Sequence, residues 1–385
     1  MKVRLTSLLL TIISLTAQGQ QAPSPEERAK RLFDLSDRNR DDKLTREELP
    51  ERLRPNFDRV DANKDGFISR AEHLAVMSRQ TPSRPSPENA RRPLLEGIEA
   101  KLDLPYADTE NPRQRLDLYL PKLRKTDKPL PVVVFIHGGG WRNGDKATGA
   151  NNVGRYVTSG EYAGVSIGYR LTGEARWPAQ IHDCKAAIRW IKAHAQEYNL
   201  NPEKIGVWGS SAGGHLVSML GTSGDVKELE GTLGKHLDQN SKVACVANYY
   251  GPENFLTMIR QPSQIDRTKG AEYPEALLLG GAVPEREETA REASPVTHVS
   301  AGDAPFFTAH GTEDPLVPFA QGEEVHEALK KAGVPSILQQ MTHGGHGFRS
   351  ELLDQRLKQF FDKYLRGIES EIDSSPITVE TRQKK

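Results

Sequence analysis

Apolar and polar positions follow two different periods along residues 94–367. Residues 132–136 form an unbroken apolar run, typical of a central parallel strand covered on both faces. Between 178 and 198, apolar residues recur with helical spacing, and residues 116–120 alternate like an early antiparallel strand. Further strands are predicted at 162–169, 205–208, 243–248, 305–309 and 336–341, and a last helix at 351–365. This alternation predicts an α/β fold: one doubly wound, mostly parallel sheet of about eight strands.

The first 19 residues follow a different pattern. Lys2 and Arg4 precede an apolar run over about 5–15, and small residues occur at Ala17 and Gly19. A basic start, a short apolar centre and small residues at the end describe a secretory signal peptide, which we expect to be cleaved after Gly19. The run is too short to span a bilayer, and no later stretch reaches that length. The sequence therefore predicts an exported protein, secreted or periplasmic, with no membrane span.

Composition divides the remaining chain into four parts. Residues 26–79 are charged and hold two acidic loops between short helices, and 80–93 are a proline-rich linker. The large domain occupies 94–367, and 368–385 form a polar tail that we expect to fray. Lys and Arg number 52, as do Asp and Glu, so no bulk charge favours nucleic acid. Cys184 and Cys245 are predicted to be buried free thiols.

The most informative motif is Gly209-Ser210-Ser211-Ala212-Gly213, which follows an apolar strand and precedes a helix-compatible segment. This is the G-x-S-x-G turn that presents a nucleophilic serine, here Ser211. A serine hydroxyl needs a base, and the base needs an acid to orient it.

Two loops at predicted strand ends offer those groups in the expected chain order. The first carries Asp314 beside Glu313, and we favour Asp314 as the acid because it precedes Pro315 at the turn. The second is glycine-rich and carries His346 and His343. We favour His346 as the base, since His343 lies at the strand's end. His215, one turn beyond Ser211, is interpreted as a packed histidine.

Residues His137-Gly138-Gly139-Gly140-Trp141 follow the predicted strand 132–136. Consecutive glycines leave backbone N–H groups open to a substrate oxygen, and Ala212 adds another N–H next to the nucleophile. A phosphate-binding loop is the rival interpretation, but no Lys-Ser or Lys-Thr pair follows the glycines.

With these motifs, residues 94–365 resemble an α/β-hydrolase of the esterase and lipase group, closest to secreted carbohydrate esterases of the acetyl-xylan and feruloyl type. The resemblance implies that Gly139 and Gly140 donate to the oxyanion, and that segment 253–293 builds the pocket. It implies cleavage of small-molecule or polysaccharide esters, with acetyl or feruloyl groups expected. An amidase, a formamidase or a peptidase on the same fold stays open, as does an adhesion or scaffold protein with an inactive hydrolase domain.

The two acidic loops place oxygen-bearing residues at the spacing that calcium requires. The second loop carries glycine at its sixth position, Gly66, whereas the first carries Asp42 there, which we expect to weaken it. The ligands expected in the first loop are Asp37, Asn39, Asp41, the main chain of Lys43, and Glu48. Those in the second are Asp61, Asn63, Asp65, the main chain of Phe67, and Glu72.

The acidic region thus resembles a small all-α EF-hand pair, with one helix around 47–58 serving both loops. Calcium outside the cell is steady, so weak sites there stay filled. We therefore expect a structural or docking module that binds Ca²⁺ and has its own partner, and no cofactor for catalysis.

Overall fold

The computed structural model describes residues 30, 33–34, 36–37, 39, 41–49, 54, 57–80, 95–267 and 272–380. The chain forms two compact units, 1–89 and 90–385, and each is described by itself. The predicted signal peptide 1–19, the linker residues 81–93 and the start of the acidic region lie outside the described residues. No helix among the described residues is long and apolar enough to cross a membrane.

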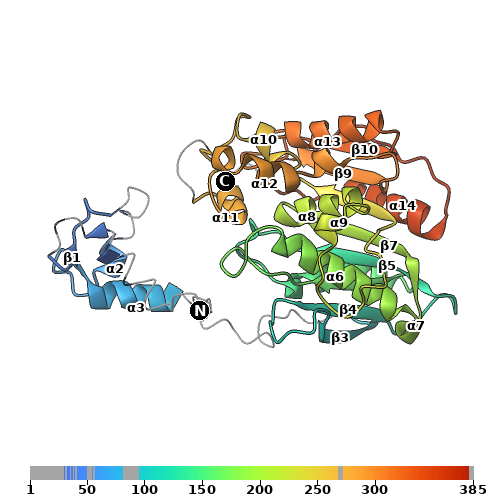
Figure 1. The fold of residues 1–385 in the computed structure, drawn as a ribbon, viewed down its shortest axis with the longest axis horizontal. Helices are drawn as coiled ribbons and strands as arrows, with labels where there is room; N and C mark the ends of the chain where they lie inside the picture. Colours follow the sequence, from blue (N-terminus) through green and yellow to red (C-terminus); the bar gives the residue numbers. More distant parts are fainter. Residues whose placement is uncertain are drawn as a thin grey trace, which may run out of the picture. The chain divides into compact units, whose positions relative to one another are not determined.

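The large unit is built on a nine-stranded sheet in the order β11-β10-β9-β8-β7-β5-β6-β4-β3 (Figure 1). Strand β4 pairs antiparallel with β3 and with β6, and all other pairs are parallel, which confirms the prediction of a mostly parallel sheet. The strands are β3 Ile98–Pro105, β4 Arg115–Pro121, β5 Leu130–Ile136, β6 Ala163–Ile167, β7 Leu200–Ser210, β8 Cys245–Tyr249, β9 Phe306–Gly311, β10 Ser336–Thr342 and β11 Ile377–Thr378.

Helices cover both faces of this sheet, as expected where strands and helices alternate. On one face α6 and α8 bury Ile181, Ile188 and Leu216 in the larger apolar cluster. On the other, α5 and α14 bury Val153 and Phe361 in a second cluster. The helices of this unit are α5 Gly149–Thr158, α6 Ala179–Ala193, α7 Ala195–Tyr198, α8 Ala212–Thr222, α9 Lys227–Glu230, α10 Phe255–Met258, α11 Pro274–Leu279, α12 Glu287–Glu292, α13 Ala320–Lys331 and α14 Glu351–Arg366.

Two strands at the sheet edges were not expected from the sequence. Strand β3 carries a register shift between Lys101 and Leu104, and five consecutive residues, 100–104, are only half-buried, which blurs the alternation. Strand β11 lies in the polar tail: Ile377 is buried and pairs with Met341 of β10. The tail is therefore not frayed up to residue 380, because one buried isoleucine and backbone bonds anchor it.

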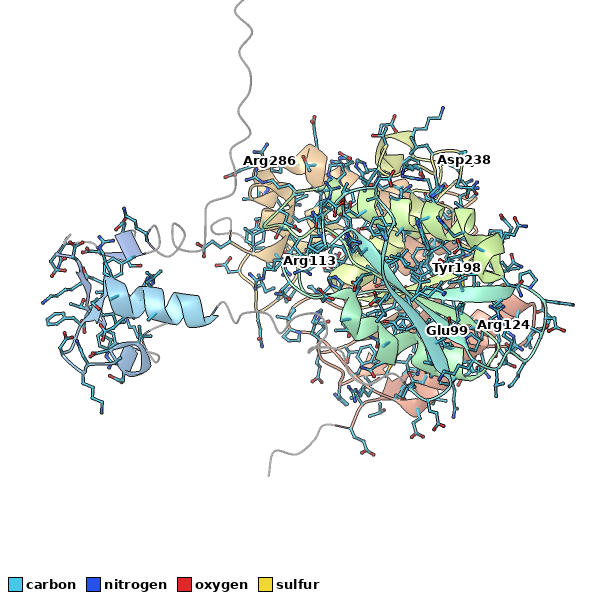
Figure 2. The ribbon with its side chains drawn as sticks, turned by 90° about the horizontal axis from the view of Figure 1, so that it is seen from below. Glu99, Arg113, Arg124, Tyr198, Asp238 and Arg286 are labelled. Atoms are coloured by element: carbon cyan, nitrogen blue, oxygen red, sulfur yellow. The ribbon has the colours of Figure 1, made fainter. Side chains whose placement is uncertain are left out.

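The sequence places the free thiols correctly, since Cys184 and Cys245 are both buried and unbridged. Arg124, which follows β4, donates hydrogen bonds of 2.9 and 3.0 Å to the carbonyls of Tyr198 and Asn199, which precede β7; Arg124 and Tyr198 are labelled in Figure 2. These bonds hold the turn after α7, where Asn199 adopts φ 51°, against the segment that follows β4.

The small unit contains two short strands, β1 Lys43–Leu44 and β2 Ile68–Ser69, paired antiparallel. Its helices are α2 Phe57–Val60 and α3 Arg70–Gln80. Phe33, Leu44, Leu49, Phe57 and Ile68 form a separate core. Of the single helix expected over 47–58, the structure describes only parts: 46–48 form a turn and α2 covers Phe57–Val60, while 50–53 and 55–56 lie outside the described residues.

A buried carboxylate ties β4 to helix α6. Asp183, whose side chain is fully buried, accepts hydrogen bonds from Arg170 Nη2 at 2.8 Å and Gln114 Nε2 at 2.8 Å. The backbone N–H of Arg170 adds a third bond of 2.8 Å. A buried carboxylate is stable only when it is compensated in this way.

We expect Asp183→Ala to lower the free energy of unfolding by about 3 kcal/mol or more, because it leaves Gln114 and Arg170 without their acceptor. Urea denaturation measures this loss. The matched control is Glu287→Ala, which removes an exposed i,i+4 partner of Arg291 and should cost at most about 0.5 kcal/mol. Equal losses in the two variants would contradict the assignment.

Candidate active site

Ser211 occupies the sharp turn between β7 and α8. Its backbone adopts φ 54° and ψ −122°, a strained conformation for a residue with a side chain. The turn leaves no room for a side chain at Gly213, since an added Cβ would lie 2.1 Å from the carbonyl oxygen of Ile136. The glycine at this position is therefore required by the close approach of β5, as the motif predicted.

The structure brings Ser211, His346 and Asp314 together from the ends of β7, β10 and β9. His346 Nε2 lies 2.9 Å from Ser211 Oγ, and His346 Nδ1 lies 2.8 Å from Asp314 Oδ2. An ionised carboxylate only accepts, so Nδ1 carries the proton and Nε2 is free to accept from the serine hydroxyl. This is the order of groups in which a base removes the proton of a nucleophile.

Asp314 is a fully buried carboxylate with four donors around it. Its Oδ1 accepts from the N–H groups of Leu316 at 2.8 Å and Val317 at 3.0 Å, and His310 Nε2 lies 3.5 Å from its Oδ2. Burial by itself raises the pKa of this carboxyl, but the bonds from His310 and His346 outweigh it and hold the pKa well below its usual range. Asp314 therefore remains ionised and fixes the tautomer of His346.

The two rejected candidates contact each other instead. Glu313 Oε1 lies 2.6 Å from His343 Nδ1, and both side chains are more than half exposed. Their pairing orders the outer surface of the same two loops. Asp314 and His346 thus lie in line with Ser211, whereas Glu313 and His343 pair with each other away from it.

The glycine-rich loop lies against the nucleophile. A Cβ added to Gly138 would lie 3.4 Å from the Cβ of Ser211. Gly139 and Gly140 adopt φ 112° and φ 59°, conformations that side chains disfavour. Within the described residues, the N–H groups of Gly139 and Gly140 have no hydrogen-bond acceptor. Together with Ala212, the first residue of α8, these positions can supply N–H donors next to Ser211.

Buried rings hold this loop in place. Trp141 Nε1 donates to His215 Nδ1 at 3.2 Å, so His215 carries its proton on Nε2 and donates it to the carbonyl of Ala293 at 2.7 Å. Burial lowers the pKa of His215 to about 4. His215 is the packed histidine that the sequence suggested, and it also anchors the residue that follows the three glycines.

Further anchors act on the two flanks of the loop. Tyr169 donates to the carbonyl of His137 at 2.9 Å, and the two rings stack with centroids 4.3 Å apart. Arg113 donates to the carbonyl of Gly144 at 2.6 Å (Figure 2). The loop is thus preorganised by contacts from β4, β6 and α8.

The segment 253–293 lies close to the glycine-rich loop where it is described. A Cβ added to Gly140 would lie 3.2 Å from Pro274, the first residue of α11. Arg267 and Glu275 form a buried ion pair of 3.1 Å, and Arg267 also donates to the carbonyl of Leu316 at 2.8 Å. These bonds connect the segment to the loop that carries Asp314; residues 268–271 lie outside the described residues.

Two residues near the site were missed in the sequence. His310, near the end of β9, approaches Asp314 in the loop that follows, and the spacing of four residues was an available signal. Tyr250 directly follows β8 and packs the edge of its ring on His346, with centroids 4.8 Å apart. No motif marks Tyr250, since its role depends on which strand lies beside β7.

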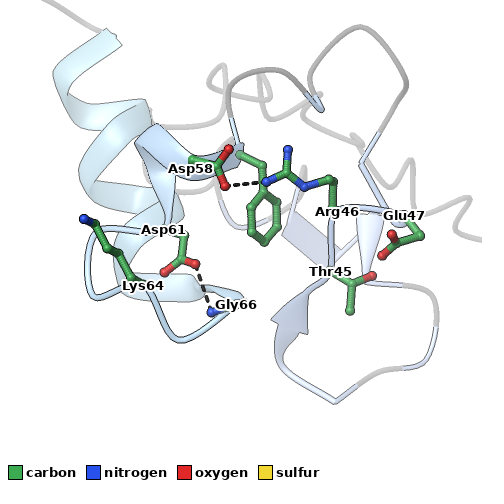
Figure 3. Close-up of a pocket in the computed structure, with 8 residues that line it drawn as sticks. Thr45, Arg46, Glu47, Asp58, Asp61, Lys64 and Gly66 are labelled. Carbon is green, nitrogen blue, oxygen red and sulfur yellow. Dashed lines mark hydrogen bonds and ion pairs between the residues drawn. The ribbon is translucent and has the colours of Figure 1, made fainter.

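The acidic loops of the small unit share one hydrogen-bond pattern. Asp37 accepts from the N–H groups of residues 41 and 42, and Asp61 accepts from those of 65 and 66. Figure 3 shows the bond between Asp61 and Gly66. Asp42 and Gly66 both adopt positive φ, 63° and 85°, so the first loop follows the same path despite lacking glycine.

The other predicted ligands take part in the same loops. Asn39 and Asn63 contact Asp41 and Asp65, each at 3.0 Å, and Lys43 and Phe67 donate their N–H groups to those aspartates. Glu48 and Glu72 accept from the N–H groups of Thr45 and Ser69. Within the part of the chain that is described, no three acidic, histidine or cysteine side chains converge as a metal site.

Comparison with known proteins places the large unit. Residues 116–329 match the family described as BD-FAE. Esterase LipC of Mycobacterium tuberculosis is 29% identical over 246 residues, which cover 64% of this chain and 59% of that protein. The probable carboxylic ester hydrolase LipM of the same organism is 32% identical over 226 residues, covering 57% and 49%. The chain therefore spans about half to three fifths of the length of these curated relatives.

Solved structures show the same similarity. A truncated carbohydrate esterase from gut microbiota superposes with a TM-score of 0.65 at 29% identity, covering 71% of this chain and all of that one. A bifunctional GH43-CE protein of Bacteroides eggerthii gives a TM-score of 0.63 at 34% identity, covering 69% and 38%. Because the family match extends over more than half of the sequence, the chain belongs to the BD-FAE family, and its large unit is similar to esterases and carboxylic ester hydrolases.

Proposed function

We propose that the protein is a secreted or periplasmic serine esterase that cleaves acyl esters through a covalent acyl-enzyme. One observation carries this proposal: an unbroken hydrogen-bonded series from the buried Asp314 through His346 to Ser211. The series ends beside the free N–H groups of the glycine-rich loop.

The proposed reaction has two halves. Ser211 Oγ attacks the ester carbonyl while His346 Nε2 takes its proton, and Asp314 stabilises the imidazolium that forms. The negative oxygen of the tetrahedral intermediate accepts from the N–H groups of Gly139, Gly140 and Ala212. The alcohol leaves with the proton from His346. Water then attacks the acyl-Ser211 by the same route, which releases the acid and restores the serine.

The proposed substrates are acetyl or feruloyl esters of carbohydrates. This rests on the resemblance described above and on the solved neighbours, one of which is described as a carbohydrate esterase. The same geometry also serves an amide, because both reactions pass through a tetrahedral intermediate. A formyl-anilide assayed beside acetylated xylan and methyl ferulate separates the ester from the amide.

We also propose that the small unit is an EF-hand pair that binds Ca²⁺ in a structural or docking role. The residues fit calcium by their chemistry: carboxylate, amide and main-chain oxygens at the required positions, with a left-handed residue at the sixth position of each loop. Asp37, Asp61, Asn63 and Glu72 are among the residues that would hold the ion, while catalysis uses none of them.

For the catalytic residues, we expect Ser211→Ala, His346→Ala and Asp314→Asn each to lower kcat for 4-nitrophenyl acetate by about 10⁴-fold or more. The matched controls are His343→Ala and Glu313→Gln. These two residues pair with each other and have no described contact with Ser211 or the glycine-rich loop. Initial rates and circular dichroism of the five variants measure activity and fold. Large loss in a control, or retained turnover in Ser211→Ala, would overturn the assignment.

The free energy of unfolding should depend on the ionisation of His215, which anchors the glycine-rich loop through Trp141. The pKa of this group lies near 4 when folded, against an ordinary value of 6.5, so the unfolded chain binds the extra proton between these values. The wild-type protein therefore loses stability from this group as pH falls from about 6.5 to about 4, on the order of 3 kcal/mol in all.

In His215→Asn the ionisable group is removed. We expect the variant to be less stable than wild type at pH 8, because the carbonyl of Ala293 loses its donor. The difference in free energy of unfolding between the two proteins should narrow as pH approaches 4. Urea denaturation at several pH values measures the gap. A gap that stays constant across the range would contradict the pKa of His215 and its burial.

For calcium, we expect the full chain to bind with a dissociation constant on the order of 10⁻⁴ to 10⁻³ M, the range of extracellular modules. Glu72→Gln should weaken binding at one site roughly tenfold or more, because the twelfth position supplies two oxygens. Isothermal calorimetry measures this, with Glu47→Gln, outside the ligand spacing, as control. Absence of binding at millimolar calcium would refute the proposal.

A further inference from the structure

His346 lies in a loop that gives its side chain little support. Gly345 and Gly347 flank it, and Gly347 adopts φ 129°. One backbone hydrogen bond of 2.9 Å joins the two glycines. A Cβ added to Gly347 would meet nothing within 4 Å, and one added to Gly345 would meet only Pro315, at 4.0 Å. Because glycine leaves the backbone free and little packs against this loop, the loop alone does not fix the direction of the imidazole.

Two hydrogen bonds and one aromatic ring hold the imidazole instead. Nδ1 of His346 lies 2.8 Å from Asp314 Oδ2, and Nε2 lies 2.9 Å from Ser211 Oγ. The ring of Tyr250 packs against the imidazole with centroids 4.8 Å apart and the planes inclined at 63°. Among the described residues, Tyr250 is the only ring in contact with His346. Tyr250 therefore adds packing to a side chain that is otherwise held by polar contacts.

Tyr250 is itself firmly placed. Its N–H donates to the carbonyl of Ala309 at 2.9 Å, and the carbonyl of the preceding Tyr249 accepts from the N–H of Ser211 at 2.8 Å. These bonds join it to β9, which leads to the acid, and to the turn that carries the nucleophile. Phe348 packs on its ring with centroids 5.2 Å apart. Tyr250 also adopts φ 42°, a strained conformation that its surroundings must stabilise.

The demand on His346 differs between the two halves of the proposed reaction. During acylation, the hydroxyl of Ser211 donates to Nε2 and helps to align the ring. In the acyl-enzyme, Oγ is an ester oxygen and has no proton to donate. The bond to Asp314 then remains alone, and the terminal torsion of an imidazole is broad. Yet Nε2 must still face the water whose proton it takes as the water oxygen attacks the acyl carbonyl.

We propose that Tyr250 is a positioning residue that holds the imidazole of His346 in place during deacylation, when Ser211 no longer does. This rests on the proposed acyl-enzyme mechanism. With Nε2 held toward the water, the tetrahedral intermediate forms and collapses, the acid leaves, and Ser211 Oγ regains its proton from His346. Burial raises the pKa of Tyr250, so its hydroxyl stays protonated and does not act as a second base.

The test removes the ring in two ways, with Tyr250→Leu and with Tyr250→Asn. Asparagine tolerates positive φ, so the second variant keeps the backbone conformation while the ring is lost. For 4-nitrophenyl acetate, we expect kcat to fall about ten- to a hundredfold, because a misplaced base slows deacylation. The value of kcat/KM covers only the steps up to release of 4-nitrophenol, and should change less than about threefold. KM should therefore fall together with kcat.

Intact-mass spectrometry after acid quenching gives an independent measurement. At saturating ester, the fraction of enzyme that carries an acetyl group should be higher in both variants than in wild type. Tyr250→Phe keeps the ring and should restore kcat to within about twofold of wild type. The second control is Tyr198→Leu, which removes another half-buried tyrosine whose ring lies beside a histidine, His194, on α7. It should leave both kinetic values unchanged, and circular dichroism checks the fold of all four variants.

Three results would overturn the positioning role alone. The first is an unchanged kcat in Tyr250→Leu and Tyr250→Asn. The second is an equal loss in kcat and kcat/KM, which would mean that both halves of the reaction depend on Tyr250. The third is a loss in Tyr250→Phe as large as in Tyr250→Leu, which would assign the effect to the hydroxyl. Retained turnover in Ser211→Ala would instead overturn the proposed function, and this inference with it.

Discussion

The buried carboxylate of Asp314 determines how three loops are arranged. A negative charge inside a protein is stable only when donors surround it, and here they come from two N–H groups of its own loop and from two histidines. The loops after β9 and β10 therefore reach low free energy in one arrangement. Because the same bonds point His346 at Ser211, the order of these loops and the placing of an imidazole next to the serine hydroxyl have a common cause.

Backbone strain gathers at the same end of the sheet. Trp141, Ser211, Tyr250 and His343 adopt φ between 42° and 60°, and they follow β5, β7, β8 and β10. Each such residue costs on the order of 1–3 kcal/mol, which only a well-packed surrounding can hold. The central strands supply that packing, since their side chains are buried on both faces. Parallel strands also bring all four loops to one edge, so chemistry concentrates where the strain lies.

The sequence predicted the central strands well, because buried parallel strands are continuous apolar runs. Such a run can be recognised without knowing which strands pair with it. The edge strands β3 and β11 were missed for the opposite reason. Strand β3 is interrupted by a bulge and β11 has only two residues, so each is recognised as a strand only from its pairing with a neighbouring strand. Ser211, Asp314 and His346 were selected from loop chemistry and chain order, and the structure brings their side chains together. Tyr250 and the bond from Trp141 to His215 did not, since both arise from which strands and helices become neighbours in space.

Within the described residues, the buried hydroxyl of Tyr249 has no hydrogen-bond partner, and this carries a thermodynamic argument of its own. A phenylalanine at 249 would pack in the same volume without leaving a buried hydroxyl unsatisfied, and such replacements are neutral or stabilising. Tyr249 therefore costs folding free energy in the absence of a ligand. Costs of this kind persist where binding or catalysis uses the group, which is the usual trade between stability and activity.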